Sequence, residues 1–299
     1  FYFCASHSIM YRLVINKEKS IMLFNNQYKQ IISHILEEGY EDINARTGAK
    51  TKSLPGVTIQ VDLIKEFPLL SLRKIPVKNF VAEMMWFVSG ENDTNVFLNE
   101  RTKIWKSFTE EDGTIETAYG HRWRHAFGRD QLMMLIDLLK KDPSSRHGVI
   151  VTWDPRSDGL GDTLKKNIPC PYTFTVNIIG GKLHLHNTIR SNDMVLGCPT
   201  DVAGFAFLAL MLAAHLGVEP GTYTHSISNA HIYEDHYSAA QLMVDRDLDD
   251  FRKTPPLELT ENSLQKAMDL DEHFYDSMVK YFSEYYNPHD HIKGLLITV

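Results

Sequence analysis

Apolar side chains recur at the spacing of a helix in four stretches of the chain. These stretches cover residues 25–38, 77–88, 130–141 and 203–216. Gly39 follows the first and suits its C-terminal cap, and Pro143 stops the third. The second places a single carboxylate, Glu83, among apolar neighbours. The fourth is apolar nearly all round, so we expect a helix that is buried in the centre of the protein.

Shorter apolar runs predict strands. They cover residues 57–63, 148–153, 172–179 and 222–228, and the second of them is typical of a short buried strand. Gly180 and Gly181 follow the third run and precede another alternating run, which predicts a β-hairpin with a two-residue turn. Residues 45–56 are basic and rich in Gly and Thr, so we expect an exposed loop there. With no repeat and no linker, the chain is expected to form a single α+β domain, in which helices cover a mixed sheet.

Composition narrows the class of protein. The 299 residues are 43% apolar and carry a formal net charge of -7, whereas nucleic-acid affinity comes from clustered Lys and Arg, so we do not expect a nucleic-acid partner. Three scattered cysteines predict no disulfide framework and indicate a reducing compartment. No run approaches the roughly 20 apolar residues of a membrane helix, so we expect a cytoplasmic protein. His184 and His186 share a strand face, but no third ligand has matching spacing, so no metal site is expected.

Candidate chemistry gathers around Cys170. Prolines on both sides keep this residue out of a helix and present the thiol at the start of a strand. Arg190 ends the returning strand, and both residues lie about nine positions from the Gly-Gly turn, so the hairpin is expected to bring them side by side. A cysteine taken alone is more often a small core residue. A nucleophilic cysteine needs a positive neighbour that lowers its pKa, and Arg190 is the candidate for that role.

A series of short motifs resembles, in the same order, those of thymidylate synthase and its pyrimidine hydroxymethylase relatives. The motifs are RTG, FPLLSLRK, EMMWFVSG, YGHRWR, DPSSRHGVIVTW, PC at 169–170, RSNDMVLGCPTDVAGFAFL, SNAHIYEDH and PHDHIKGLLITV. The resemblance covers a catalytic domain of residues 24–299 and leaves residues 1–23 as an N-terminal extension. It implies an α+β homodimer that associates through its sheet. The implied reaction transfers the one-carbon unit of 5,10-methylenetetrahydrofolate to C5 of a pyrimidine nucleotide.

The resemblance also implies a role for each matching residue. Cys170 is the nucleophile that adds to C6 of the pyrimidine, Glu83 is the general acid and base, and Tyr119 assists removal of the C5 proton. The residues expected to bind the nucleotide are Arg46, Arg190 and Ser191 at the 5'-phosphate, Arg146 reaching the same phosphate from the partner subunit, and His231 and Tyr233 at the 3'-hydroxyl. The residues expected to contact the folate are Arg73, Ile104, Trp105, Asp193, Leu196, Gly197 and Val299.

One departure from the synthase pattern bears on the substrate. A synthase has an amide where this chain has Asp201. That amide donates to O4 of uracil and accepts from N3–H, whereas cytosine presents an amino group and an unprotonated N3. A carboxyl group accepts from the amino group and, when it carries a proton, donates to N3. Because a mismatched polar group costs roughly 1–3 kcal/mol, Asp201 indicates deoxycytidylate, as the same replacement does in the deoxycytidylate hydroxymethylases.

Further departures bear on the product and the sugar. Pro171 replaces a synthase histidine near O4, His147 replaces the second arginine of a phosphate-binding motif, and Ser191 favours deoxyribose. Thr200 replaces a bulky aromatic residue, and a small hydroxylated residue there can admit water, which gives a hydroxymethyl product. The synthase-like C-terminus ending in Val299 argues instead for a methyl product. We therefore expect a deoxycytidylate 5-hydroxymethyltransferase. The alternatives are a deoxycytidylate C5-methyltransferase, a thymidylate synthase acting on dUMP and, in a different class, an RNA-binding protein without activity.

Overall fold

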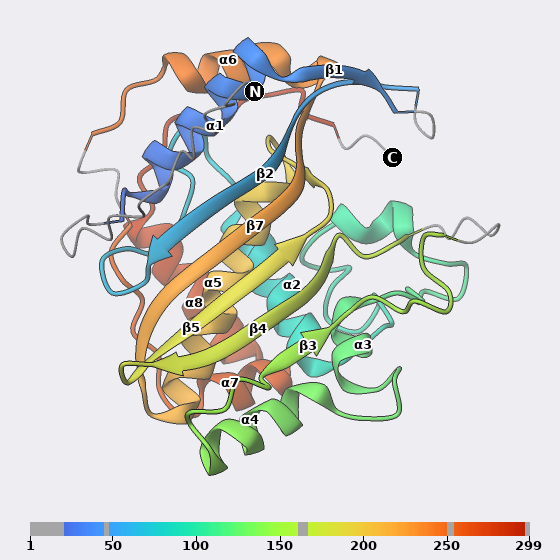
Figure 1. Ribbon diagram of the computed structural model, residues 1–299, viewed down its shortest axis with the longest axis vertical. Coiled ribbons are helices and arrows are strands. Elements are labelled where there is room, and N and C mark those ends of the chain that lie inside the picture. The colour runs from blue at the N-terminus through green and yellow to red at the C-terminus, as the bar shows by residue number, and fades with distance from the viewer. Residues whose placement is uncertain (1–20, 45–47, 161–166, 250–253, 297–299) are drawn as a thin grey trace, which may run out of the picture.

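A single β-sheet lies at the centre of the computed structural model, which describes residues 21–44, 48–160, 167–249 and 254–296 (Figure 1). Within these residues the sheet has seven strands: β1 (Tyr40–Ile43), β2 (Lys50–Asp62), β3 (Val149–Val151), β4 (Pro171–Ile179), β5 (Lys182–Ile189), β6 (Asn192–Asp193) and β7 (Glu219–Tyr233). Their order is β1-β2-β7-β5-β4-β3, with β6 also paired to β7. Pairing is antiparallel except that β5 and β6 run parallel to β7. The prediction of a mixed sheet is confirmed.

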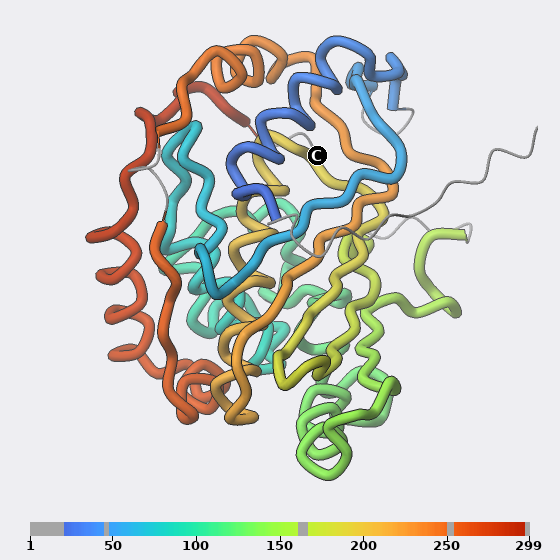
Figure 2. The backbone as a smooth tube through the Cα atoms, turned by 60° about the vertical axis from the view of Figure 1, so that its left-hand side comes forward, coloured from blue at the N-terminus to red at the C-terminus, as the bar shows by residue number. Residues whose placement is uncertain are grey.

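Helices are packed behind this sheet. They are α1 (Phe24–Glu38), α2 (Val77–Ser89), α3 (Tyr119–Arg124), α4 (Gln131–Lys141), α5 (Gly197–Leu216), α6 (Tyr237–Asp245), α7 (Ser263–Met268) and α8 (Glu272–Tyr285), with 3-10 turns η1 (Ile104–Phe108) and η2 (Glu234–His236). α5 packs against β5 and β7, and α2 packs in turn against α5, α7 and α8 (Figures 1 and 2). The sheet and α5 therefore form the centre of the core, and α2 brings Glu83 toward it.

The central helix α5 is confirmed, and it begins earlier than its apolar pattern predicts. Its first turn contains Pro199, which is tolerated there because the first N–H groups of a helix have no intrahelical partner. α5 is the one helix in the described part of the chain that is long and apolar enough to cross a membrane, and 78% of its apolar window is buried within the protein. That burial is typical of the core helix of a globular protein.

The predicted helices α1, α2 and α4 are confirmed, but the cap of α1 works differently from the expectation. Gly39 has an extended backbone with φ of -61°, so it does not provide a left-handed cap. A Cβ built on Gly39 would lie 2.4 Å from the carbonyl oxygen of Ile35. Glycine is therefore required there by the close approach of the chain to the last turn of the helix.

The prediction of an exposed loop at residues 45–56 is wrong from Lys50 onward, because those residues belong to β2. Residues from Lys50 onward pair with β7, in a register that places Thr51 opposite Tyr233. The adjacent strand satisfies the backbone hydrogen bonds, which do not depend on how polar the side chains are. Apart from the buried Thr51, residues 50–56 are partly or fully exposed, and they lack the apolar alternation that predicts a strand.

β3 is an edge strand rather than the buried strand that its apolar run predicts. Ile150 is buried, whereas Val149 and Val151 are 47% and 38% exposed. Only β4 pairs with it among the described strands, so one face of its short apolar run stays uncovered within this chain.

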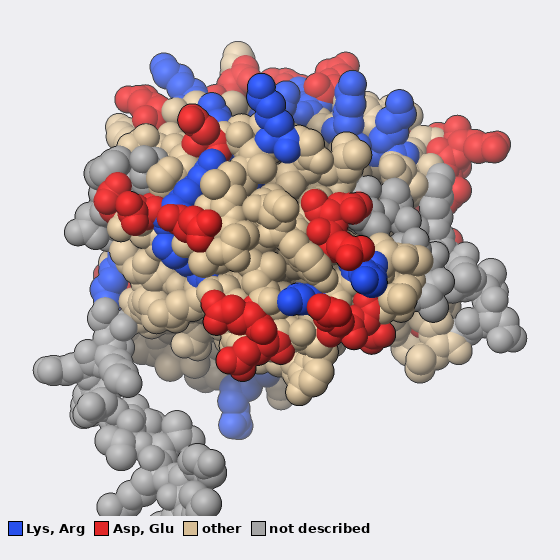
Figure 3. All heavy atoms as spheres, turned by 90° about the horizontal axis from the view of Figure 1, so that it is seen from above, with Lys and Arg blue, Asp and Glu red and all other residues tan. Residues whose placement is uncertain are grey.

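Charged side chains of both signs are interspersed on the face of the molecule seen from above, over α1, α6 and β1 (Figure 3). Two ion pairs join β2 to its neighbours: Lys52 lies 3.8 Å from Glu41 of β1, and Lys50 lies 3.5 Å from Glu234 of η2. Exposed pairs of this kind contribute little to stability.

Candidate active site

The open end of the β4–β5 hairpin places Cys170 beside Arg190. From the Gly-Gly turn the two strands keep one register as far as Thr173 and Thr188. A β-bulge then inserts one extra residue, Tyr172, into β4. As a result the N–H of Arg190 donates to the carbonyl oxygen of Cys170 at 2.9 Å, whereas an unbroken register would place Cys170 opposite the next residue. The predicted proximity of the two residues is confirmed, and the bulge is what completes it.

The Arg190 guanidinium is fixed by the residues that precede the cysteine. Nε donates to the carbonyl oxygen of Pro169 and Nη2 to that of Ile168, both at 2.9 Å. Nη2 also lies 3.7 Å from Sγ of Cys170, which is a half-buried thiol. A fixed positive charge at this distance favours the thiolate form, which is the nucleophilic form of cysteine.

Glu83 lies on the buried side of α2, with 9% of its surface exposed. Nε1 of Trp105 donates to Oε1 of Glu83 at 2.5 Å and so fixes the carboxyl group. Burial raises the pKa of Glu83 to about 8, the charge of Asp201 adds to the rise, and the bond from Trp105 opposes it. At neutral pH this side chain is therefore a proton donor, which suits a general acid.

Tyr119, the first residue of α3, links the acid to the thiol. Its hydroxyl accepts the N–H of Cys170 at 3.4 Å, and its ring meets that of Trp105 edge-on at 5.3 Å. Burial raises the pKa of Tyr119, and the charges of Cys170, Asp201 and Glu83 raise it further. These four ionisable side chains therefore occupy one electrostatic neighbourhood.

Asp201 lies on the first turns of α5 and remains partly exposed. Nδ2 of Asn192 donates to its Oδ2 at 2.7 Å. Burial of the group raises the pKa of Asp201 to about 7 and the charge of Asp193 adds to the rise, while the bond from Asn192 opposes it. A Cβ built on Gly197 would lie 3.2 Å from Nδ2 of Asn192, so a glycine at that position leaves room for the Asn192–Asp201 pair.

A thiol with a fixed arginine, two carboxyl groups of raised pKa and a buried tyrosine thus meet at one end of the sheet. A comparison with protein families matches residues 26–298 to the thymidylate synthase family. The chain belongs to the thymidylate synthase family. Members of this family bind a pyrimidine nucleotide and use methylenetetrahydrofolate to transfer a one-carbon unit to C5 of the base. The protein is therefore a one-carbon transferase of nucleotide metabolism.

Three of the residues that the family resemblance assigns to the sugar and phosphate, His231, Tyr233 and Ser191, lie near this end of the sheet. β6 pairs with β7 so that Asp193 lies next to His231. The rings of His231 and Tyr233 lie 5.0 Å apart, edge-on, and both residues are less than a tenth exposed. Burial lowers the pKa of His231, while the charge of Asp193 opposes the shift. Ser191 is partly exposed and directly follows Arg190.

Arg146 does not join these residues within the chain. It is exposed in the segment between α4 and β3. The next strand begins with Val149, which pairs with Thr175, and at about 3.3 Å per residue that pair lies roughly 16 Å along β4 from Cys170. The N–H of Val176 also donates to the carbonyl oxygen of Gly148 at 2.8 Å, so the backbone that leads from Val149 back to Arg146 runs away from Cys170.

Most of the folate-contacting residues expected from the family lie around Glu83 and Asp201, in contact with solvent or at the edge of the core. Leu196 and Gly197 begin α5 and are partly exposed, as is Ile104, which begins η1. Oδ1 of Asp193 accepts the N–H of Val195 at 2.8 Å. Arg73 is 3% exposed and its Nη2 donates to the carbonyl oxygen of Val195, so its guanidinium braces the segment before α5. Arg46 and Val299 lie outside the described residues.

The side chains around the expected folate site have the chemistry that a folate ring needs. Trp105 and Phe108 meet edge-on at 5.8 Å and offer apolar ring faces, and the partly exposed Asp193 offers a carboxylate to a polar ring edge. No cluster of three or more His, Cys, Asp or Glu side chains capable of holding a metal ion occurs in the described residues.

Asn192, His225 and Tyr223 are not among the site residues predicted from the sequence. Asn192 lies in the RSNDMVLG motif between Ser191 and Asp193, which were predicted to contact the nucleotide and the folate. His225 and Tyr223 lie two residues apart on the inward face of β7. A polar histidine at a core-facing position of a strand is a signal that period-two alternation could have flagged.

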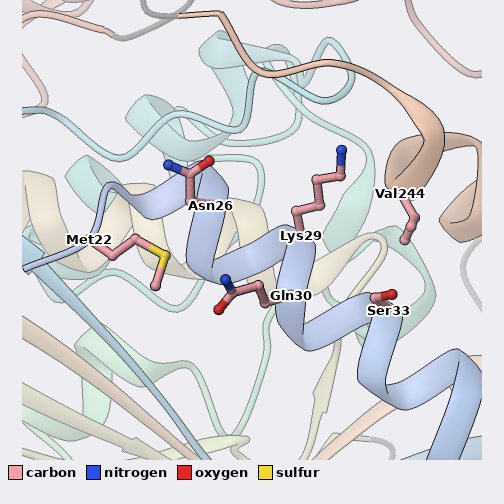
Figure 4. Close-up of a pocket in the computed structure, with 6 residues that line it drawn as sticks. All are labelled: Met22, Asn26, Lys29, Gln30, Ser33 and Val244. Carbon is pink, nitrogen blue, oxygen red and sulfur yellow. The ribbon is translucent and has the colours of Figure 1, made fainter.

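A surface pocket of about 450 Å³ lies elsewhere, on the outer face of α1 (Figure 4). Its lining residues are Met22, Asn26, Lys29, Gln30, Ser33 and Val244. These lining residues include no cysteine, no histidine and no carboxyl group. Nζ of Lys29 is engaged with the carbonyl oxygen of Arg246 at 2.7 Å. The chemistry of the protein therefore belongs to the Cys170 site rather than to this pocket.

Proposed function

We propose that the protein is a deoxycytidylate 5-hydroxymethyltransferase that uses 5,10-methylenetetrahydrofolate. The observation that carries the proposal is the Asp201 carboxyl group, which is hydrogen-bonded to Asn192 and shares one electrostatic neighbourhood with Cys170, Glu83 and Tyr119. A pyrimidine attacked by the Cys170 thiol would meet this carboxyl group where the amide of a synthase would meet uracil.

The protonation behaviour of Asp201 supports cytosine as the base. With a pKa of about 7, the carboxyl group exchanges a proton in the neutral range. Ionised, it accepts from the amino group of cytosine, and protonated, it also donates to N3. Uracil presents an acceptor at O4 and a donor at N3, so an ionised Asp201 would face O4 with no proton to offer. The mismatch costs roughly 1–3 kcal/mol, or about 5- to 150-fold in specificity.

The remaining side chains serve the attack on C6. The positive charge of Arg190 lies beside Sγ of Cys170 and favours the thiolate, which adds to C6. The electron pair of the C5–C6 double bond is then freed for C5 to act as a nucleophile. Glu83 is protonated at neutral pH and supplies a proton to the base as negative charge develops there. Tyr119, bonded to the backbone of Cys170, assists removal of the C5 proton.

The hydroxymethyl product is favoured by the residue that precedes Asp201. Bound folate supplies a carbon at the oxidation level of formaldehyde, which ends as a hydroxymethyl group if water adds and as a methyl group if hydride adds. Thr200 is partly exposed, and its hydroxyl lies 3.5 Å from the carbonyl oxygen of Leu196. A short polar side chain at this position leaves space for a water molecule beside the base and offers it a hydrogen bond.

The position of Arg146 supports a homodimer. Within one chain Arg146 lies far from Cys170, so it can complete a phosphate site only from a second copy. On the face of the sheet opposite α5, no helix of the described residues covers β4 and β5 (Figure 1), and we propose that two copies associate through this face. An isologous contact of this kind would give each site one Arg146 from its partner.

The test is to incubate the purified protein with methylenetetrahydrofolate and dCMP, dUMP or CMP, and to identify the product nucleotide by mass spectrometry. We expect dCMP to gain CH2O while tetrahydrofolate is released. A gain of CH2 together with dihydrofolate would instead identify a methyltransferase, and turnover of dUMP without turnover of dCMP would refute the role of Asp201.

A further inference from the structure

A chain of hydrogen bonds runs from Asp201 into the core of the sheet. Oδ2 of Asp201 accepts from Nδ2 of Asn192 at 2.7 Å, and Oδ1 of Asn192 lies 3.0 Å from Nε2 of His225. Nδ1 of His225 lies 2.7 Å from the hydroxyl of Tyr223. His225 and Tyr223 are both fully buried. Buried polar groups at this spacing are hydrogen-bonded, and their donor and acceptor roles depend on one another.

The direction of every bond in this chain follows from the charge on Asp201. An ionised carboxylate only accepts, so Asn192 must turn its NH2 group toward Asp201 and its carbonyl oxygen toward His225. Nε2 of His225 must then carry the proton. His225 stays neutral because burial, assisted by the charge of His186, lowers its pKa to about 3. Its Nδ1 is therefore an acceptor, and it receives the hydroxyl proton of Tyr223.

We propose that Asn192, His225 and Tyr223 form a positioning relay that holds Oδ2 of Asp201 as a hydrogen-bond acceptor and makes Oδ1 the oxygen that takes up a proton. A hydrogen bond donated to one carboxylate oxygen stabilises negative charge on that oxygen, so the proton goes to the other. Asp201 then offers one acceptor and one donor in a defined order, which matches the amino group and N3 of cytosine. The relay rests on the proposed function and extends it, because it assigns the specificity to three residues beyond Asp201.

The relay also disfavours uracil. For Asp201 to donate to O4, the proton would have to sit on Oδ2, where the NH2 group of Asn192 already points. Rotating that amide would turn its NH2 group toward Nε2–H of His225, so two donors would face each other. To remove this clash between two donors, His225 would have to change tautomer, and the hydrogen bond between Tyr223 and His225 would have to reverse its direction within the core. Binding of uracil, which needs the reverse hydrogen-bond pattern, therefore requires all three relay residues to rearrange.

The tautomer of His225 is a direct test. Long-range 15N–1H NMR of histidine-labelled protein at pH 8.5, where Asp201 is ionised, is expected to report the Nε2–H tautomer for His225. The Asn192→Ala variant removes the group that imposes this choice, so its spectrum should show a shift toward a mixture of tautomers. An Nδ1–H tautomer in the wild type would overturn the relay.

A pair of substitutions at His225 tests its effect on specificity. His225→Gln keeps an NH2 donor near the position of Nε2, whereas His225→Leu removes it. We expect the ratio of kcat/KM for dCMP to that for dUMP to fall about tenfold or more in His225→Leu and to stay within about threefold of wild type in His225→Gln. Tyr223→Phe, a smaller change, should lower the ratio by a few fold. Tyr275→Phe is the matched control, because it removes the hydroxyl of a largely buried tyrosine on α8. Among the described residues, this hydroxyl donates only to the carbonyl oxygen of Lys78, at 3.5 Å.

The outcomes separate the relay from the proposed function. A wild type that prefers dUMP would refute the proposed function, and with it the specificity assigned to the relay. A wild type that prefers dCMP, combined with an unchanged ratio in His225→Leu and Tyr223→Phe, would refute the relay alone. Equal losses in His225→Leu and His225→Gln would also refute it, because they would show that size rather than the donor matters.

Discussion

Replacing Glu83 with glutamine should make the stability of the protein less sensitive to pH. The Glu83 carboxyl group has its pKa raised from the ordinary value of 4.5 to about 8, first by burial and then by the charge of Asp201. Between these two values the folded protein retains a proton that the unfolded chain has released. The free energy of unfolding of the wild type therefore falls as pH rises through this window, and the stabilising contribution is complete only below the lower value. The Glu83→Gln variant never ionises, so it lacks this contribution to the slope.

The size of the effect follows from the width of the window. Each pH unit within it corresponds to about 1.4 kcal/mol, so between pH 5 and pH 8 the wild type should lose about 4 kcal/mol relative to Glu83→Gln. Asp201 adds a slope of the same sign in both proteins, since burial raises its pKa from 3.8 to about 7. Glutamine also retains an oxygen that can accept from Nε1 of Trp105, so the hydrogen bond at 2.5 Å need not be lost.

Urea unfolding at pH 5, 6.5, 8 and 9 measures this difference. Protein concentration must be held constant, because any association of subunits adds to the apparent stability. Glu100→Gln is the control, since the Glu100 side chain is 84% exposed and its replacement should leave the wild-type slope unchanged. Parallel curves for the wild type and Glu83→Gln would refute the raised pKa. Turnover by Glu83→Gln should fall about 100-fold or more if Glu83 is the general acid.

Three further predictions concern the nucleophile, the base and the partner subunit. Cys170→Ala should abolish turnover while calorimetry still detects nucleotide binding, and full activity in this variant would contradict covalent catalysis. Asp201→Asn should move the kcat/KM ratio toward dUMP by about tenfold or more, because an amide can donate to O4, and an unchanged ratio would count against the role of Asp201. Arg146→Ala and Cys170→Ala should each be inactive alone, yet mixing them after partial unfolding should restore up to about a quarter of wild-type activity, since each mixed dimer has one complete site. Failure of the mixture to recover activity would argue that Arg146 acts within its own chain or has no catalytic role.

Local chemistry explains which parts of the fold could be predicted. The helices α1, α2 and α4 follow from one-sided apolar spacing, and the β4–β5 hairpin follows from a Gly-Gly pair between alternating runs. α6, α7 and α8 were not predicted. The first half of β2 was missed because its side chains are polar, and its strand conformation depends on pairing with β7, which lies far away in the sequence.

The candidate site divides in the same way. The amino-acid sequence is enough to predict that Cys170 and Arg190 are neighbours, because the length of the two strands and the turn set their approximate register. The bulge that aligns them, and the contact between Asn192 and His225, 33 residues apart, depend instead on the tertiary structure. That contact forms because β6 and β5 both lie along β7, a non-local pairing that turn chemistry and side-chain periodicity do not encode.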